Sequence, residues 1–139
     1  MPNRPFDVFQ GEMGAMAIRI HELNHVALHV SDLQASIQFY GQVLGLPQIK
    51  RPAFDFEGAW FALGSQELHL ISDPDLDPAR RRHHHFALLV DDAYAAKAEL
   101  AARGVTGLEG PPPRPDGPMQ LFFHDPDGYR IEMYHLPKA

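Results

Sequence analysis

Residues 24–32 read NHVALHVSD, and the same pattern returns 60 positions later as HHFALLVDD in residues 84–92. Apolar side chains alternate with others in both stretches, and both then run into aspartates, as in a strand that leads into a capped helix. A histidine stands at the same place in each copy, His25 in the first and His85 in the second. The chain therefore predicts two copies of one structural unit, each opening with a strand that carries a histidine.

A second matched pair of alternating strands follows, at residues 66–72 and 129–135. His69 lies in the middle of the first of these strands and Glu132 in the middle of the second, 63 positions apart. A helix and two further strands are predicted between the matched strands of each copy. We therefore predict an α+β fold of two βαβββ modules, whose curved mixed sheets form a cup.

The predicted boundaries give one domain over residues 21–139, with module one at 21–73, a linker at 74–82 and module two at 83–136. Residues 1–20 fit neither repeat and are predicted to form an N-terminal extension. The two helices are expected to begin at an aspartate or its neighbour, and glycines follow their ends. The expected strands are residues 23–30, 48–51, 56–63 and 66–72 in module one, and 83–90, 105–108, 118–124 and 129–135 in module two.

Composition excludes several classes of protein. The 139 residues suffice for one domain with a sizeable core, and 45% hydrophobic with 22% charged residues is ordinary for a globular chain. The net charge of −6 argues against nucleic-acid binding, the absence of cysteine excludes thiolate ligands, and no apolar stretch is long enough to span a bilayer. We expect a cytoplasmic protein that acts on a small molecule, with no nucleic-acid or membrane partner.

Strand alternation predicts where the ligand-type side chains point. In residues 24–30 the apolar side chains share one face, which must pack against the following helix, so His25 points to the opposite side of the sheet. The same reasoning applies to His69, His85 and Glu132 in their own strands. All four side chains are therefore expected on the faces that the helices do not cover, and we predict that they form a metal site.

Three imidazoles and one carboxylate suit a divalent transition metal (Zn²⁺, Ni²⁺, Co²⁺, Fe²⁺ or Mn²⁺) and disfavour Mg²⁺ and Ca²⁺. If His69 does not bind the ion, His25, His85 and Glu132 make a site of two histidines and one carboxylate with open positions. If His69 does bind, two positions of an octahedral ion still remain open. In both cases the ion could act as a Lewis acid toward a substrate oxygen.

Other side chains could contact the substrate. His29 lies on the face of the first strand that carries the predicted ligand, and Arg130 and Tyr134 flank the carboxylate ligand on its own face. Trp60 and two nearby phenylalanines could line an aromatic pocket. The predicted substrate-binding residues are His29, Trp60, Arg130 and Tyr134.

These motifs resemble the vicinal oxygen chelate superfamily, which includes glyoxalase I, bleomycin-resistance proteins and extradiol dioxygenases. The matching motifs are LNHVAL at 23–28, FY at 39–40, LGL at 44–46, HFAL at 85–88 and DPDGYRIE at 125–132. The resemblance covers residues 23–136. It implies paired modules around a divalent metal, with the family's ligand positions falling on His25, His69, His85 and Glu132. It also implies a homodimer, because small members often build one site from two chains.

The sequence departs from the family at one of these positions. Metal-dependent glyoxalase I usually has a carboxylate where this chain has His69, and methylmalonyl-CoA epimerase has a glutamine or a carboxylate there. This replacement leaves Glu132 as the expected catalytic base. Bleomycin-sequestering members lack metal ligands, so the four ligand-type residues of this chain argue against pure drug sequestration.

The leading hypothesis is a metal-dependent lyase or isomerase of the glyoxalase I type, acting on a small substrate with vicinal oxygens. One alternative is a small Fe²⁺ dioxygenase of the extradiol type, which would need only the site of two histidines and a carboxylate. A second alternative is a small-molecule binding or resistance protein of the bleomycin-resistance type. Neither the substrate nor the identity of the metal follows from the sequence.

Overall fold

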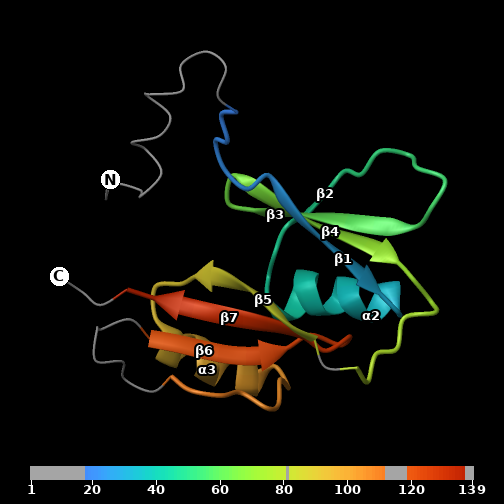
Figure 1. Cartoon of the computed structure of the whole chain (residues 1–139). Helices are drawn as coiled ribbons and strands as arrows, with labels where there is room; N and C mark the ends of the chain where they lie inside the picture. Colours follow the sequence, from blue (N-terminus) through green and yellow to red (C-terminus); the bar gives the residue numbers. More distant parts are fainter. Residues whose placement is uncertain (1–17, 81, 112–118, 137–139) are drawn as a thin grey trace.

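The structure is a computed structural model, and it describes residues 18–80, 82–111 and 119–136 (Figure 1). The predicted N-terminal extension lies outside these residues as far as residue 17. The elements are β1 (His25–Val30), α2 (Leu33–Ile37), η2 (Gln38–Val43), β2 (Gln48–Ile49), β3 (Gly58–Leu63), β4 (Gln66–Ser72), β5 (Arg82–Leu89), α3 (Ala93–Ala102), β6 (Met119–His124) and β7 (Tyr129–His135).

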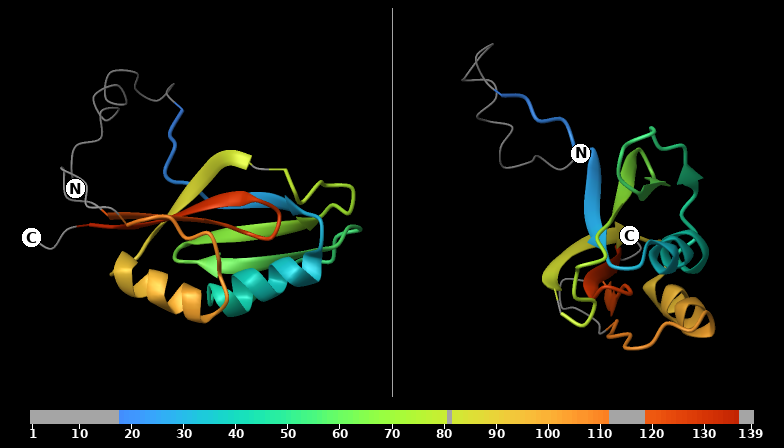
Figure 2. Two further views of the ribbon diagram at one scale, coloured as in Figure 1. Left: turned by 90° about the horizontal axis from the view of Figure 1, so that it is seen from below. Right: turned by 90° about the vertical axis from the view of Figure 1, so that its right-hand side faces the viewer.

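The strands form two sheets, one from each module. The first sheet has the order β1-β4-β3-β2 and the second has the order β5-β7-β6. In each sheet the module's first strand pairs in parallel with its last strand, and the other pairs are antiparallel. Figure 2 shows both helices on one side of the two sheets. This is the predicted α+β fold, built from a repeated unit.

The alternation predicted from the sequence is confirmed. Leu28 and Val30 of β1 are buried, while His25 and His29 are exposed on the opposite face. One hydrophobic core runs through both modules, because the buried side chains of both sheets and both helical segments belong to a single cluster. The faces that carry the ligand-type residues are therefore free of the helices. In the part of the chain that the structure describes, no helix is long and apolar enough to cross a membrane.

The first helix is not the single α-helix that the sequence predicts. Asp32 caps α2 by accepting a hydrogen bond from the backbone N–H of Ala35, but after Ile37 the chain continues as a π-helix, η2. The wider turn lets the consecutive rings of Phe39 and Tyr40 both enter the core, where they meet edge to face with centroids 5.2 Å apart. Periodicity alone cannot distinguish this local widening from a regular helix.

Several strands are shorter than predicted. β2 ends at Ile49 and β3 begins at Gly58, because Arg51 donates a hydrogen bond of 2.7 Å to the carbonyl of Phe56 and closes the loop between the two strands. β1 begins at His25, two residues later than expected, and Leu23 is exposed.

Residues 105–108, which the structure describes, do not form the predicted strand. Gly104 and Gly107 have φ values of 91° and 68°, which turn the chain just before this segment and within it. The chain then regains contact with the sheet, where Glu109 forms an isolated bridge to Phe122.

The turn between β6 and β7 fastens the two modules together. Tyr40 of the first module donates a hydrogen bond of 2.8 Å to Asp125, and Asp127 accepts one of 3.0 Å from the backbone N–H of Ser31. The hydroxyl of Tyr129 donates to a backbone carbonyl of β1 at 2.9 Å. Burial raises the pKa of Asp125 from about 3.8 to about 6, although the hydrogen bonds that it accepts act in the opposite direction.

Candidate metal centre

The open face of the first sheet brings two predicted ligands together. β1 and β4 run in parallel with Ala27 opposite His69, so His25 and His69 lie diagonally on the same face. Their imidazole rings are stacked, with centroids 4.2 Å apart and an angle of 18° between the ring planes. Two imidazoles stacked in this way can present nitrogen atoms to one cation.

His69 is held by its neighbours on the sheet. Trp60 lies opposite it on β3, and the indole stacks on the imidazole with a centroid distance of 3.9 Å and an angle of 2°. Glu67 lies two residues earlier on the same strand face, and its carboxylate is 2.8 Å from Nε2 of His69. The imidazole is thus fixed between two rings and oriented by a carboxylate.

These hydrogen bonds leave one nitrogen of each imidazole available to a cation. Glu67 accepts the Nε2–H of His69, so Nδ1 of that ring keeps its lone pair. Asn24 accepts the Nδ1–H of His25 through its side-chain oxygen at 2.8 Å, which leaves Nε2 of that ring. Histidines that bind a metal through one ring nitrogen commonly donate the N–H of the other nitrogen in a hydrogen bond, as both imidazoles do here. This half of the site therefore fits a divalent transition metal.

The open face of the second sheet carries the other two predicted ligands. Glu132 is 6% exposed, and the side-chain amide of Gln120 donates a hydrogen bond to its Oε1. Ala87 of β5 lies opposite Glu132, so His85 is its diagonal neighbour on the same face. The exposed ring of His85 meets Phe122 edge to face, with centroids 5.9 Å apart. A carboxylate and an imidazole are thus available on one surface.

The two open faces are built alike beyond the ligands themselves. In each sheet an alanine stands beside the module's second ligand on one side, and an aromatic residue stands beside it on the other. The duplication seen in the sequence therefore extends to the surroundings of each ligand pair. The equivalent residues are Ala27 and Ala87, His69 and Glu132, and Trp60 and Phe122.

One chain does not bring all four ligands together. Within the described ranges, no group of three or more histidine, aspartate or glutamate side chains lies close enough to hold a metal ion. His25 and His69 belong to the first sheet, while His85 and Glu132 belong to the second sheet. Figure 1 shows the two sheets as separate units. Each chain therefore offers two half-sites, each made of two ligand-type side chains.

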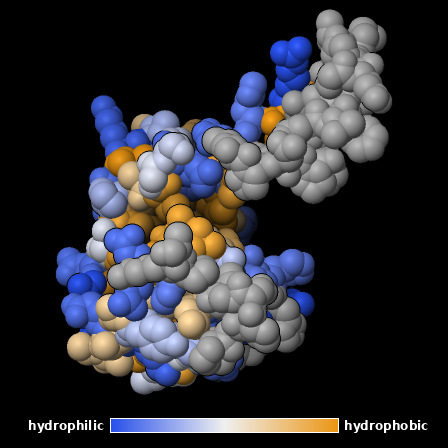
Figure 3. Space-filling view, turned by 90° about the vertical axis from the view of Figure 1, so that its left-hand side faces the viewer, coloured by the Kyte–Doolittle hydropathy of each residue, from blue (hydrophilic) through white to orange (hydrophobic). Residues whose placement is uncertain are grey.

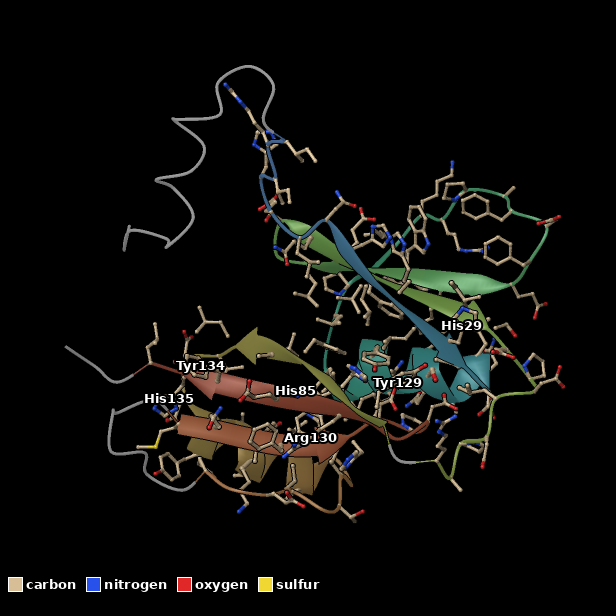
Figure 4. All side chains as sticks on the ribbon, in the orientation of Figure 1. His29, His85, Tyr129, Arg130, Tyr134 and His135 are labelled. Atoms are coloured by element: carbon tan, nitrogen blue, oxygen red, sulfur yellow. The ribbon has the colours of Figure 1, made fainter. Side chains whose placement is uncertain are left out.

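The predicted substrate contacts are divided between the two sheets (Figure 4). His29 is exposed and pairs with Asp73 at 3.1 Å. Trp60 stacks on His69 of the first half-site. On the second sheet the guanidinium of Arg130 lies 4.0 Å above the ring of Phe122. Tyr134 is partly buried on the face of Glu132, and its neighbour in register on β5 is Leu89, which is 72% exposed.

Sequence reasoning missed two side chains that hold the ligands, Glu67 and Gln120. Glu67 carries a signal that could have been used, because it lies two residues before His69 and must share its face. Gln120 lies on a neighbouring strand, and its contact with Glu132 depends on the pairing register of β6 and β7. The pairing register of two strands does not follow from the sequence alone.

Comparison with known proteins identifies the family of the chain. A sequence model of the Glyoxalase/Bleomycin resistance protein/Dioxygenase superfamily matches residues 22–133. The chain belongs to this superfamily. Its two sheets are thus the paired modules that the resemblance implied, and the four predicted ligand residues lie inside the matched range.

Individual members of the superfamily are similar over most of the chain. The lactoylglutathione lyase of Neisseria meningitidis is 33% identical over 120 residues, which are 79% of this chain and 87% of the relative. The lactoylglutathione lyase of Haemophilus influenzae is 31% identical over 121 residues, 80% of this chain and 90% of the relative. A glyoxalase/dioxygenase from Nostoc punctiforme shares the fold, with a TM-score of 0.70, 24% identity and coverage of 98% of this chain and 97% of that one.

Proposed function

We propose that this protein is a metal-dependent lyase or isomerase of the glyoxalase I type, acting on a small substrate with two vicinal oxygens. The observation that carries the proposal is the pair of equivalent half-sites, each with a histidine on the module's first strand and a second ligand on its last strand. The relatives named lactoylglutathione lyase support the same reaction class.

His25, His69, His85 and Glu132 would hold the ion, with His69 bound through Nδ1 and His25 through Nε2. When bound, a divalent ion supplies Lewis acidity toward the two neighbouring oxygens of the substrate. The hydrogen bonds that the imidazoles donate to Asn24 and Glu67 keep each ring in the tautomer that leaves the required nitrogen available.

Glu132 is the proposed catalytic base. It removes the proton from the hydroxyl-bearing carbon next to the substrate carbonyl and returns it to the former carbonyl carbon, while the hydroxyl proton passes from the first oxygen to the second. The carbonyl thereby moves to the neighbouring carbon without any net gain or loss of atoms. Its burial keeps water away from the transferred proton, and Gln120 holds one carboxylate oxygen in place so that the other can face the substrate. The imidazole of His69 would not serve as this base, because it donates its Nε2–H to Glu67 and would bind the ion through Nδ1.

A second copy of the chain would complete each site. The two half-sites of one chain lie on different sheets, so the simplest full site combines the first half-site of one chain with the second half-site of another. Figure 3 shows apolar surface between the two halves of the molecule, a feature that suits a subunit interface. Leu23, Leu89 and Leu136 are among the large apolar residues exposed in the described part of the chain.

Metal titration tests the proposal most directly. Calorimetry of the purified protein with Ni²⁺, Co²⁺ and Zn²⁺ should show one tight site per chain, and the binding should be lost in His25→Ala and in His85→Ala. Proton exchange at the carbon of a hemithioacetal substrate, followed by NMR in D₂O, should require the metal and Glu132. A protein that takes up no divalent ion would contradict the proposal, and consumption of oxygen with a catechol and Fe²⁺ would favour a dioxygenase instead.

A further inference from the structure

The open face of the second sheet carries a guanidinium group, that of Arg130, whose surroundings favour the binding of an anion. Arg130 is partly buried on β7, two residues before Glu132 and on the same face. Its neighbours in register on the two flanking strands are His85 and His124, so no acidic side chain stands beside it on either strand. In a chain with a net charge of −6, this local positive group is set apart from the general surface.

The carboxylate that could have paired with this guanidinium is committed elsewhere. Glu132 accepts its hydrogen bond from Gln120, on the side away from Arg130 along the strand. Arg130 belongs to none of the ion pairs between described residues, such as those of His29 with Asp73, His69 with Glu67, and Arg103 with Glu99. A partly desolvated guanidinium without an anionic partner is unfavourable, and an anion bound there would relieve this cost.

The way in which Arg130 is held suits a planar anion. Its guanidinium lies over the ring of Phe122, with the central carbon 4.0 Å from the ring centroid. Stacking uses the face of the guanidinium and leaves its N–H groups in the plane, where a carboxylate can accept two parallel hydrogen bonds. The equivalent position on the first sheet is Glu67, whose charge is already used by His69. The two half-sites therefore differ at this position.

We propose that Arg130 binds a carboxylate of the substrate, so that the substrate class is a small anionic compound whose vicinal oxygens chelate the metal. This inference rests on the proposed function. Residues two apart on one strand face are separated by about 7 Å, so one small molecule can reach both the ion held by Glu132 and the guanidinium. The carboxylate would then stand a few bonds away from the chelating oxygens.

A matched pair of chelators tests the inference. Succinohydroxamate and butyrohydroxamate both bind a divalent ion through two neighbouring oxygens, and they differ in that the first ends in a carboxylate and the second in a methyl group. Calorimetry of the Ni²⁺-loaded protein should show that succinohydroxamate binds at least about tenfold more tightly, the value of a charge-assisted hydrogen-bonded pair. Arg130→Gln should bind the two compounds equally and keep its affinity for butyrohydroxamate, whereas Arg130→Lys should retain part of the preference.

Arg51→Gln is the control, because it removes the same charge from an arginine that is held by Phe56 in the loop between β2 and β3. It should keep the full preference for succinohydroxamate. Equal binding of both compounds to the wild-type protein would overturn the inference, as would a preference that survives in Arg130→Gln.

If neither hydroxamate binds, the metal proposal fails. Binding of an anion by Arg130 is then tested separately, in the metal-free protein. Acetate should shift the Nε–H NMR signal of Arg130 in a saturable way, with the signal identified by its loss in Arg130→Gln. A signal that does not move with acetate would exclude the anion site on its own.

Discussion

Trp60 and His69 lie face to face on neighbouring strands, with ring centroids 3.9 Å apart and an angle of 2° between the planes. His25 covers the other face of the same imidazole at 4.2 Å. A side chain confined in this way loses little further freedom when it binds a cation, so the half-site is pre-organised. Trp60 is also the chain's one tryptophan, so its fluorescence reports on this half-site alone.

Removing the indole should weaken metal binding without removing a ligand. In Trp60→Leu the imidazole of His69 loses one of its two stacking partners and becomes more mobile, so the affinity for Ni²⁺ should fall by about tenfold. Trp60→Phe keeps an aromatic face and should lose less. Calorimetry measures both values. An unchanged affinity in Trp60→Leu would show that the stack does not order the ligand.

The hydrogen bond between Glu67 and His69 should set the tautomer of the imidazole. We expect the neutral ring of His69 to carry its proton on Nε2, which long-range ¹H–¹⁵N NMR spectra distinguish from the Nδ1–H form. In Glu67→Leu this preference should be lost, and the affinity for Ni²⁺ should fall by about 10- to 100-fold. Glu57→Gln is the control for charge, because Glu57 is an exposed residue of the loop before β3. A ring that carries its proton on Nδ1 in the wild-type protein would contradict the assignment.

A site shared between two chains should be restored by mixing two inactive variants. One variant carries His25→Ala and His69→Ala, and the other carries His85→Ala and Glu132→Ala, so neither can build a full site. Random exchange between two-fold dimers makes half of the dimers mixed, each with one intact site, so about a quarter of the normal Ni²⁺ binding and activity should return. Mixtures that stay inactive, although both variants melt as folded dimers, would place the whole site within one chain.

Asp125 should make the protein less stable as the pH rises. Its pKa is about 6 in the folded chain and about 3.8 when it is unfolded, so the folded state binds the proton more tightly between these values. The free energy of unfolding therefore falls as the pH rises from about 4 to about 6. Between pH 3 and pH 7 this group should remove about 3 kcal/mol relative to Asp125→Asn, which keeps an acceptor oxygen but has no charge.

Urea unfolding of the wild-type protein and of Asp125→Asn at several pH values measures this difference, and the other titrating groups cancel in the comparison. Tyr40→Phe supplies a second check. It removes a hydrogen bond that lowers the pKa of Asp125, so the pKa should rise further in that variant. A difference in stability that does not change with pH would show that Asp125 titrates normally in the folded chain.

Alternation and repetition were enough to predict most of the fold. They assigned the buried and open faces of β1 and β4, and these follow from the chemistry of neighbouring residues. The π-helix after Ile37 was not predictable, because it depends on how Phe39 and Tyr40 fit a core made by distant strands. The strand expected at residues 105–108 failed because two glycines with positive φ turn the chain there.

The sequence was enough to propose a set of residues for the candidate site, but not their arrangement in space. Strand alternation predicted that His25 and His69 share an open face, and in the structure their rings are in contact. Strand alternation says nothing about the distance between two different sheets, so the separation into half-sites does not follow from it. Only the family resemblance implied a site built from two chains. The role of Gln120 depends on pairing between β6 and β7, and the stack of Trp60 on His69 depends on the register of β3.

The turn between β6 and β7 also determines when the chain can fold during its synthesis. All strands of the first module precede residue 73, yet the backbone N–H of Ser31 and the hydroxyl of Tyr40 find their partners only in Asp127 and Asp125. A growing chain that stops short of this turn leaves those donors, and the apolar surface around them, without their native neighbours. The first module therefore reaches its final state only after residues 125–127 have left the ribosome.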